Sequence, residues 1–275
     1  MSNDALDGME LPALPDNARK VLSLLFGPDV SVEKVKRLIS CDGPLAAKIL
    51  NIANYDFYGG GLTPPTLSDA IMRLGFNAVR NIVVAASIKG LFKRLGDDEQ
   101  AIWRGMMGSA IASSIIARHT KLSDVEDAFI GGLLHDAGSA AIVNGFPDAY
   151  RRTLDRARKE GISFSDACKE EFGFTHREVG AAMVRRWGFP DVFESLILYF
   201  DDPEIILKER YIYNLVSIVA LADRMCLRLG ISAPMRAGAD VTFGTLGETL
   251  GIDDNGIARI LENVKVAFDR GLPLY

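Results

Sequence analysis

The sequence predicts an all-α fold, and two observations carry this prediction. Apolar residues recur with a period near 3.6 in every long segment, as they do along one face of a helix. No convincing run alternates between apolar and polar side chains, since the β-branched stretches 83–87 and 211–221 lie inside longer helical periods. We therefore expect helix to dominate and strand content to be marginal.

The N-terminal part predicts short amphipathic helices. Residues 1–14 form an extended lead-in, and a helical stripe begins after Pro15. Ser31 can cap a second helix and Asp42 a third, because short oxygen-bearing side chains accept hydrogen bonds from the first turn. The Gly- and Pro-rich segment 55–69 predicts a loop.

A longer helical pattern follows this loop. We expect Ser68 or Asp69 to open a short helix that Gly75 ends, and Asn77 to open the next one. A modest boundary falls near Gly96–Asp98, ahead of the central helices.

Two central helices lack a polar face. One covers 100–117, and the other covers 127–143 with His135 and Asp136 in its middle. A helix that is apolar nearly all round is buried in the core. We therefore expect burial of Trp103, Leu134, Ile142, Val219 and Leu221.

The remaining sequence continues the helical pattern. The basic stretch 148–161 predicts a solvated helix that Gly161 ends. Further helices are expected over 175–188, 191–200 and 209–230, and in the tail around 242–251 and 255–271.

The composition argues against several classes of protein. The chain has 275 residues, of which 48% are hydrophobic, which is enough for one large domain or two tightly packed ones. The net charge of −5 disfavours a general nucleic-acid binder, which would carry a basic surplus. Cys41, Cys168 and Cys226 lack a CxxC spacing, so we expect buried free thiols. The acidic start is unlike a signal peptide and no apolar run reaches the roughly 18–20 residues that span a bilayer, so we expect a cytoplasmic protein without membrane contact.

His135 and Asp136 are the most informative polar residues, because they interrupt an apolar helix. Adjacent residues on a helix point about 100° apart, so both side chains can bind one cation that lies beside the helix. Imidazole and carboxylate suit borderline or hard divalent metals. The alternative is a core histidine beside a capping or paired aspartate, and the dipeptide alone leaves both interpretations open.

Asp223 and His176 are further candidates. Asp223 also interrupts an apolar run, where it either contributes to a site or pairs with Arg224 or another cation. His176 opens an amphipathic helix, a place where a histidine is most often a surface or capping residue.

The order of several motifs resembles the HDOD family (HD-related output domain). The segment 11–15 (LPALP) resembles the family's LPxLP-like start, Asn54 and Tyr58 match its Asn-Ser-Ala-x-Tyr-like element, and an Ala-Ile-x-x-Leu-Gly element follows at 70–75. The likeness continues through the LLHDAG, THREVGAAM and LADR segments and covers about 11–230. The resemblance lies in the order of these motifs rather than in any one of them.

The resemblance implies a fold and a metal-ligand set. It implies an N-terminal helical bundle over 11–96 packed on an HD-like helical core over 97–275, which includes the C-terminal helices. HD-superfamily phosphohydrolases collect a His, a His-Asp pair and a later Asp around a metal. By this likeness the residual metal candidates are His135, Asp136 and Asp223, with His176 as a weaker one.

The sequence departs from that ligand set at two places. The first His should lie two residues after Trp103, where the chain has Gly105, and a later His-His pair is replaced by Tyr199 and Phe200. Glycine contributes no donor, so a two-metal centre is not expected. No cofactor is expected, although three protein ligands and water leave a single divalent metal open.

These departures favour a non-enzymatic, bacterial-type signal-transduction output module that binds a protein partner or a small ligand. In this interpretation the HD metal site is degenerate and no residue is catalytic. The alternative is a metal-dependent phosphohydrolase acting on a nucleotide or cyclic dinucleotide. A third interpretation is a nucleic-acid-associated adaptor that uses the basic face 151–158. A homodimer is left open.

Overall fold

The computed structural model of the chain confirms the all-α prediction. It describes residues 9–54, 66–92, 96–200, 206–232 and 243–270, and within these ranges there are helices and turns but no strand. In chain order the helices are α1 Asp16–Phe26, α2 Val32–Ile39, α3 Gly43–Ala53, α4 Leu67–Lys89, α5 Asp97–Thr120, α6 Val125–Leu134, α7 Ala137–Gly145, α8 Pro147–Glu160, α9 Phe164–Phe172, α10 His176–Arg186, α11 Asp191–Leu198, α12 Arg210–Arg228, α13 Gly244–Thr249 and α14 Asp254–Asp269.

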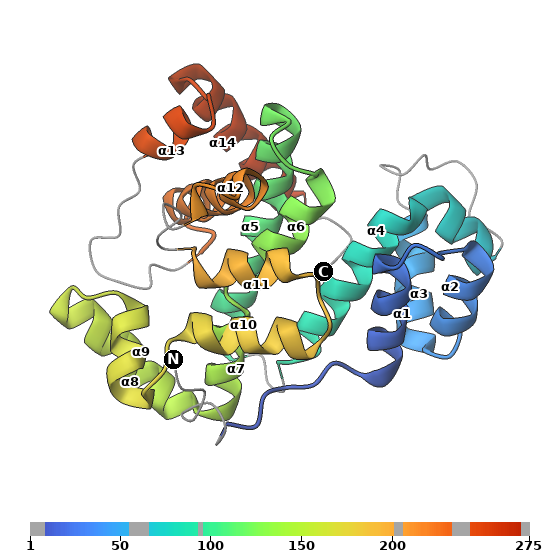
Figure 1. Cartoon of the computed structure of the whole chain (residues 1–275), viewed down its shortest axis with the longest axis horizontal. Coiled ribbons are helices and arrows are strands. Elements are labelled where there is room, and N and C mark those ends of the chain that lie inside the picture. Colours follow the sequence, from blue (N-terminus) through green and yellow to red (C-terminus); the bar gives the residue numbers. More distant parts are fainter. Residues whose placement is uncertain (1–8, 55–65, 93–95, 201–205, 233–242, 271–275) are drawn as a thin grey trace.

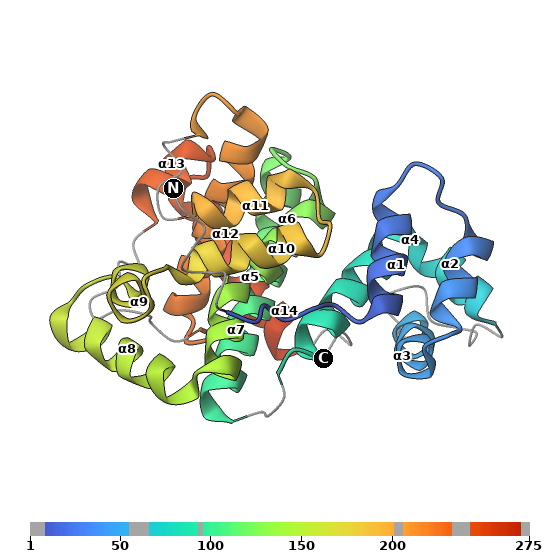
Figure 2. The same ribbon diagram turned by 60° about the horizontal axis from the view of Figure 1, so that its bottom comes forward.

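The helices form a small bundle beside a larger body. Helices α1, α2 and α3 stand together with the first part of α4, and the rest of α4 runs toward the larger body (Figure 1). The turned view in Figure 2 shows the same separation, with the segment before α1 extending along the larger body. The candidate site residues all belong to the larger body.

The first three helices begin where the sequence predicts. The side chain of Ser31 accepts a hydrogen bond from the backbone of Lys34, and that of Asp42 accepts one from Leu45. Both predicted caps are therefore confirmed. Tyr58, one of the residues that match the family pattern, lies outside the described residues.

The start of α4 differs from the prediction. Its cap is Thr66, whose hydroxyl accepts a hydrogen bond from the backbone of Asp69, so neither Ser68 nor Asp69 opens the helix. The predicted break at Gly75 is confirmed: its φ of 76° and ψ of 162° are not helical, and α4 consists of two helical stretches joined across this kink. Glycine reaches positive φ without the steric cost that a Cβ imposes.

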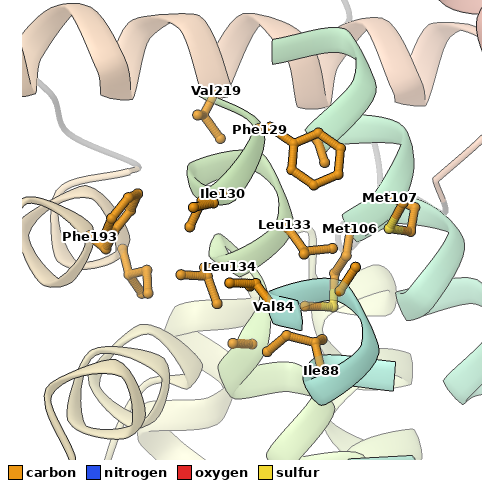
Figure 3. Packing of buried hydrophobic residues seen from close by; sticks show 14 of the residues in the cluster. Val84, Ile88, Met106, Met107, Phe129, Ile130, Leu133, Leu134, Phe193 and Val219 are labelled. Atoms are coloured by element: carbon orange, nitrogen blue, oxygen red, sulfur yellow. The ribbon is translucent and has the colours of Figure 1, made fainter. Parts of the chain in front are cut away.

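The core of the larger body is built on α5 and α6. Helix α5 packs against α6 and α12, and α10 packs against α7 and α11. Apolar side chains of α4, α5, α6, α11 and α12 meet there (Figure 3). The five residues predicted to be buried are buried, and Trp103 is the most exposed of them at 7%.

Two expectations about the core are wrong. The segment 127–143 is not one helix: α6 ends at Leu134 and α7 starts at Ala137, with His135 and Asp136 between them. The break lets α7 turn toward α10 and pack closely on it. This tertiary contact overrides the helical pattern that the sequence shows over 127–143. The other correction concerns Cys41, which is exposed, whereas Cys168 and Cys226 are buried.

Contacts tie the bundle to the larger body. The indole Nε1 of Trp187 donates a hydrogen bond to the carbonyl oxygen of Pro12 at 2.9 Å. Arg80 on α4 pairs with Asp127 on α6 at 3.3 Å, and its guanidinium lies 5.0 Å from the centre of the Phe26 ring. These contacts fix the end of α4 and the lead-in segment against the body.

Helix α4 passes a simple test for a membrane span. Among the described residues it alone is long and apolar enough by length and composition, and 50% of its most apolar window is buried. It packs against α1, α2, α3 and α6, which is the arrangement of a core helix.

Candidate functional site

The break between α6 and α7 sets the orientation of His135. The Nδ1 atom of His135 lies 2.7 Å from the carbonyl oxygen of Gly132, and a carbonyl only accepts, so Nδ1 carries the hydrogen. The opposite ring nitrogen, Nε2, is thereby turned toward Asp223 on α12, with 3.8 Å between Nε2 and Oδ1. The structure thus brings His135 and Asp223 together from different helices.

A second pair lies beside the first. The Nε2 atom of His176 is 3.9 Å from Oδ1 of Asp136, and both side chains are largely buried. His176 is the first residue of α10, where Thr175 and Glu178 form a capping box. The expectation of a surface or capping histidine is wrong, because the close packing of α7 on α10 covers His176 and leaves it only 6% exposed.

Burial dominates the electrostatics of Asp136. It raises the pKa of the Asp136 carboxyl, and the nearby carboxylate of Asp223 adds to that rise, while the neighbouring side chains of His135, Ser139 and Arg177 oppose it. The permanent charge of Arg177 therefore favours the charged form of this carboxyl.

The helices α7 and α10 touch backbone to backbone. A Cβ on Gly138 would lie 1.7 Å from the carbonyl oxygen of His176, so no residue with a side chain fits there without moving the helices. This contact positions Asp136, two residues before Gly138, opposite the start of α10.

Gly105 faces the same site. It lines the pocket that contains His135, Asp136, and Asp223. A Cβ at position 105 would lie 3.1 Å from the Cβ of Ser232, slightly closer than an ordinary contact, so a side chain at this position would crowd that serine.

An aromatic ring stands where the resemblance expects histidine. The ring of Phe200 stacks on His135, with centroids 5.2 Å apart and an interplanar angle of 28°. The guanidinium of Arg177 lies over Phe200 at 4.3 Å from the ring centre. Phe200 therefore contacts both His135, a candidate metal ligand, and the permanently charged guanidinium of Arg177.

These groups surround a pocket of about 490 Å³, which is within the size range of sites for small molecules. Its lining combines carboxylates, guanidinium groups, hydroxyls and apolar side chains from α5, α8, α9, α10 and α12. Besides the two His–Asp pairs, the lining includes Asp98, Ile102, Leu154, Arg158, Ser165, Asp166, Arg177, Arg224, Leu227 and Ser232.

The histidines and aspartates of the site lie in pairs. Within the described ranges, no three His, Cys, Asp or Glu side chains converge in an arrangement that could hold a metal ion. The four candidate residues instead form two separate His–Asp pairs at 3.8 and 3.9 Å.

Sequence reasoning missed Arg177 and Ser232. Arg177 follows His176 directly in the THREVG segment, so its place at the start of α10 is a signal that could have been used. Ser232 lies beyond the end of α12, and nothing in the local sequence brings it to Gly105.

The basic face 151–158 is ion-paired in the structure. Arg151 pairs with Asp98 at 2.6 Å, and Arg152 pairs with Glu171 at 2.9 Å. Such pairs offset the positive charge that a nucleic-acid surface needs.

The helical architecture and the two His–Asp pairs define an HD-like protein. The model of the HDOD domain family matches residues 11–203. The chain belongs to the HDOD domain family.

Three solved structures are similar to it. An HDOD domain protein of unknown function from Geobacter sulfurreducens has 26% identity and a TM-score of 0.77, with 99% of this chain and 96% of that one covered. A candidate phosphohydrolase from Shewanella amazonensis SB2B has 25% identity and a TM-score of 0.77, with coverage of 99% and 97%. The MmoQ response regulator from Methylococcus capsulatus has 26% identity and a TM-score of 0.52, with coverage of 92% and 98%.

A curated relative extends beyond the matched region. An uncharacterized protein of Treponema pallidum is 23% identical over 218 residues, which cover 78% of this chain and 42% of that protein. The chain thus spans less than half the length of this relative.

Proposed function

We propose that this chain is a non-enzymatic signal-transduction module that works by binding a small ligand or a protein partner. The observation that carries the proposal is the contact between Gly105 and Ser232. By the resemblance to HD phosphohydrolases, position 105 would supply the first metal ligand. Here it supplies none, and Ser232 is the residue that a side chain at this position would crowd.

The rest of the pocket supports the same interpretation. Metal-assisted hydrolysis needs a fixed set of ligands with open positions for water. The described acids and histidines form two pairs rather than one such set. The ring of Phe200 stacks on one face of His135, where the resemblance expects a further histidine.

The comparisons support a role in signalling without defining it. One similar structure is a response regulator, and another is a candidate phosphohydrolase. We place the protein in the cytoplasm of a bacterial-type cell, with a protein partner downstream of the binding event.

One observation favours the alternative function, a metal-dependent phosphohydrolase acting on a nucleotide or cyclic dinucleotide. Histidines that bind metals usually donate their other ring N–H to a carbonyl or carboxylate. His135 does so toward Gly132. In that alternative His135, Asp136 and Asp223 are the ligands.

Turnover and metal content together test the proposal. We would purify the full chain without chelator, measure bound metals by mass spectrometry, and assay a generic phosphodiester and cyclic dinucleotides with added Mn²⁺ or Fe²⁺. We expect no turnover above the rate without protein. Robust turnover that Asp136→Ala abolishes would overturn the non-enzymatic function and establish the alternative.

A further inference from the structure

The segment 11–15, just before α1, extends along the larger body (Figure 2). Its sequence, LPALP, restricts the backbone, because a proline fixes its own φ at about −65° and pushes the residue before it toward extended angles. Leu11 and Leu14 each precede a proline. Pro15 adopts φ −51° and ψ 136°, which is close to polyproline II. The segment therefore favours this conformation through its own sequence.

Burial along the segment follows the period of polyproline II. This helix has about three residues per turn, so Leu11 and Leu14 lie on the same side of it. Leu14 is buried in the hydrophobic core and Leu11 is partly buried against that core, whereas Ala13 between them is exposed. The two leucines are therefore the side chains that hold the segment in place.

Trp187 binds the main chain of the segment rather than one of its side chains. The indole Nε1 donates its hydrogen bond to the carbonyl oxygen of Pro12 at 2.9 Å. Sites lined by aromatic residues commonly bind proline-rich segments in this conformation. Because every residue has a carbonyl oxygen, this bond does not depend on which side chain stands at position 12.

The aromatic side of the contact is fixed by the end of α10. Gly188 adopts φ 76°, and its backbone N–H donates to the carbonyl oxygen of Arg185 at 3.0 Å. The backbone N–H of Phe189 donates to the carbonyl oxygen of Val184 at 3.1 Å, which completes a Schellman motif. The rings of Trp187 and Phe189, whose centroids are 6.2 Å apart, are thus positioned by hydrogen bonds within the larger body.

The same aromatic residues contact the small bundle. The ring of Phe26, the last residue of α1, lies 5.3 Å from that of Phe189 and 6.4 Å from that of Phe193. Segment 11–15 leads directly into α1. Displacing the segment from Trp187 therefore also loosens the attachment of α1 to the larger body.

We propose that Trp187 and Phe189 form a recognition site for extended, proline-flanked segments with leucines at positions i and i+3, and that segment 11–15 occupies it as an internal ligand. A partner protein that presents such a segment displaces the internal ligand and loosens the bundle. The chemistry of the partner follows from the chain's own segment, which is seated there. The inference rests on the binding function proposed above, and it uses no residue that lines the pocket of the His–Asp pairs.

Binding of a labelled peptide to the full chain tests the proposal. The probe is a synthetic, fluorescein-labelled peptide with the sequence of residues 9–16, and its matched control has serine in place of both leucines. Leu11→Ser in the full chain weakens the internal ligand. Fluorescence anisotropy should show that Leu11→Ser binds the probe at least about tenfold more tightly than wild type, because a tethered segment competes at a roughly millimolar effective concentration. The serine peptide should bind to neither protein.

A second substitution separates the site from general hydrophobic binding. Adding Trp187→Phe to Leu11→Ser removes the indole donor, and the loss of one hydrogen bond should weaken binding of the probe by about two- to tenfold. Adding Trp103→Phe instead is the matched control, because Trp103 is the other tryptophan of the chain and is also buried. It should leave binding unchanged. Thermal denaturation checks the folding of each variant, and Leu11→Ala replaces Leu11→Ser if the latter unfolds.

Three outcomes would overturn the proposal: equal binding of the probe by wild type and folded Leu11→Ser, equal binding of the leucine and serine peptides, or binding that Trp187→Phe leaves unchanged. A wild-type dimer that Leu11→Ser dissociates would assign the site to the lead-in of a second copy, and would overturn the choice of another protein as partner. Turnover is read separately. Hydrolysis of a phosphodiester would end the non-enzymatic function and leave the peptide site intact, whereas failure of peptide binding would end only this inference.

Discussion

The indole of Trp187 donates its hydrogen bond to the carbonyl oxygen of Pro12, a residue 175 positions earlier in the chain. The bond connects the lead-in segment with the end of α10. Since Trp187 is 4% exposed, the bond forms where water competes poorly with it.

Replacing this tryptophan tests how strongly the lead-in is attached. Trp187→Phe keeps an aromatic ring but removes the donor, and a hydrogen bond of this kind contributes about 0.5–1.5 kcal/mol. We expect the free energy of unfolding to fall by at least that amount in urea denaturation. Proteolysis should also cut the lead-in segment faster. Unchanged stability and unchanged proteolysis would show that the bond is not important for attachment.

The backbone contact between α7 and α10 predicts a severe effect at Gly138. Gly138→Ala should destabilise the protein by at least about 1–3 kcal/mol, because the new methyl group would overlap the carbonyl oxygen of His176. Gly145→Ala is the matched control, since Gly145 ends the same helix and a Cβ there meets nothing within 4 Å. Equal stability of the two variants would contradict the packing described above.

Gly105 and Ser232 should be energetically coupled. Gly105→Leu overfills the space beside Ser232, so we expect a loss of about 1–3 kcal/mol in chemical denaturation. Adding Ser232→Gly should recover part of that loss, because the two side chains compete for one space. Strictly additive effects in the double-mutant cycle would argue that Ser232 does not fill the place beside Gly105.

The capping box of α10 predicts a dependence on pH. Burial raises the pKa of Glu178, but hydrogen bonds with Thr175 and the charge of Lys169 outweigh it and hold the pKa below 4.5. A lowered folded-state pKa stabilises the protein above the unfolded-state value, and that stabilisation is lost as pH falls through the folded-state value.

Glu178→Gln isolates this contribution. We expect the variant to be less stable than wild type at neutral pH, and the difference to shrink as pH falls below 4.5. Urea denaturation at several pH values measures both. A difference that stays constant from neutral to acidic pH would mean that the charge of Glu178 is not responsible. Thr175→Ala, which removes the other half of the box, should cost about 0.5–2 kcal/mol.

Periodicity predicted the helices well, because most of their signals are local. Ser31 and Asp42 act within one turn of their own helices, and the apolar character of α5 and α6 follows directly from the residues they contain. The break at His135 and Asp136 could not be predicted in this way. No proline or turn motif marks it, and its cause is the packing of α7 on α10, which are far apart in the sequence.

The candidate site was predictable only in part. The family likeness pointed to His135, Asp136 and Asp223, and Gly105 was visible as a departure. The partnership of His176 with Asp136 depends on a tertiary contact, as does the arrival of Ser232 beside Gly105. Stacking of Arg177 on Phe200 also joins residues from two different elements.

The touching backbones of α7 and α10 have a consequence for how the site responds to mutation. Because Gly138 meets the main chain at His176, the spacing between Asp136 and His176 is set by the polypeptide itself rather than by the shapes of surrounding side chains. Substitutions of neighbouring core residues should therefore disturb this spacing less than any substitution of Gly138.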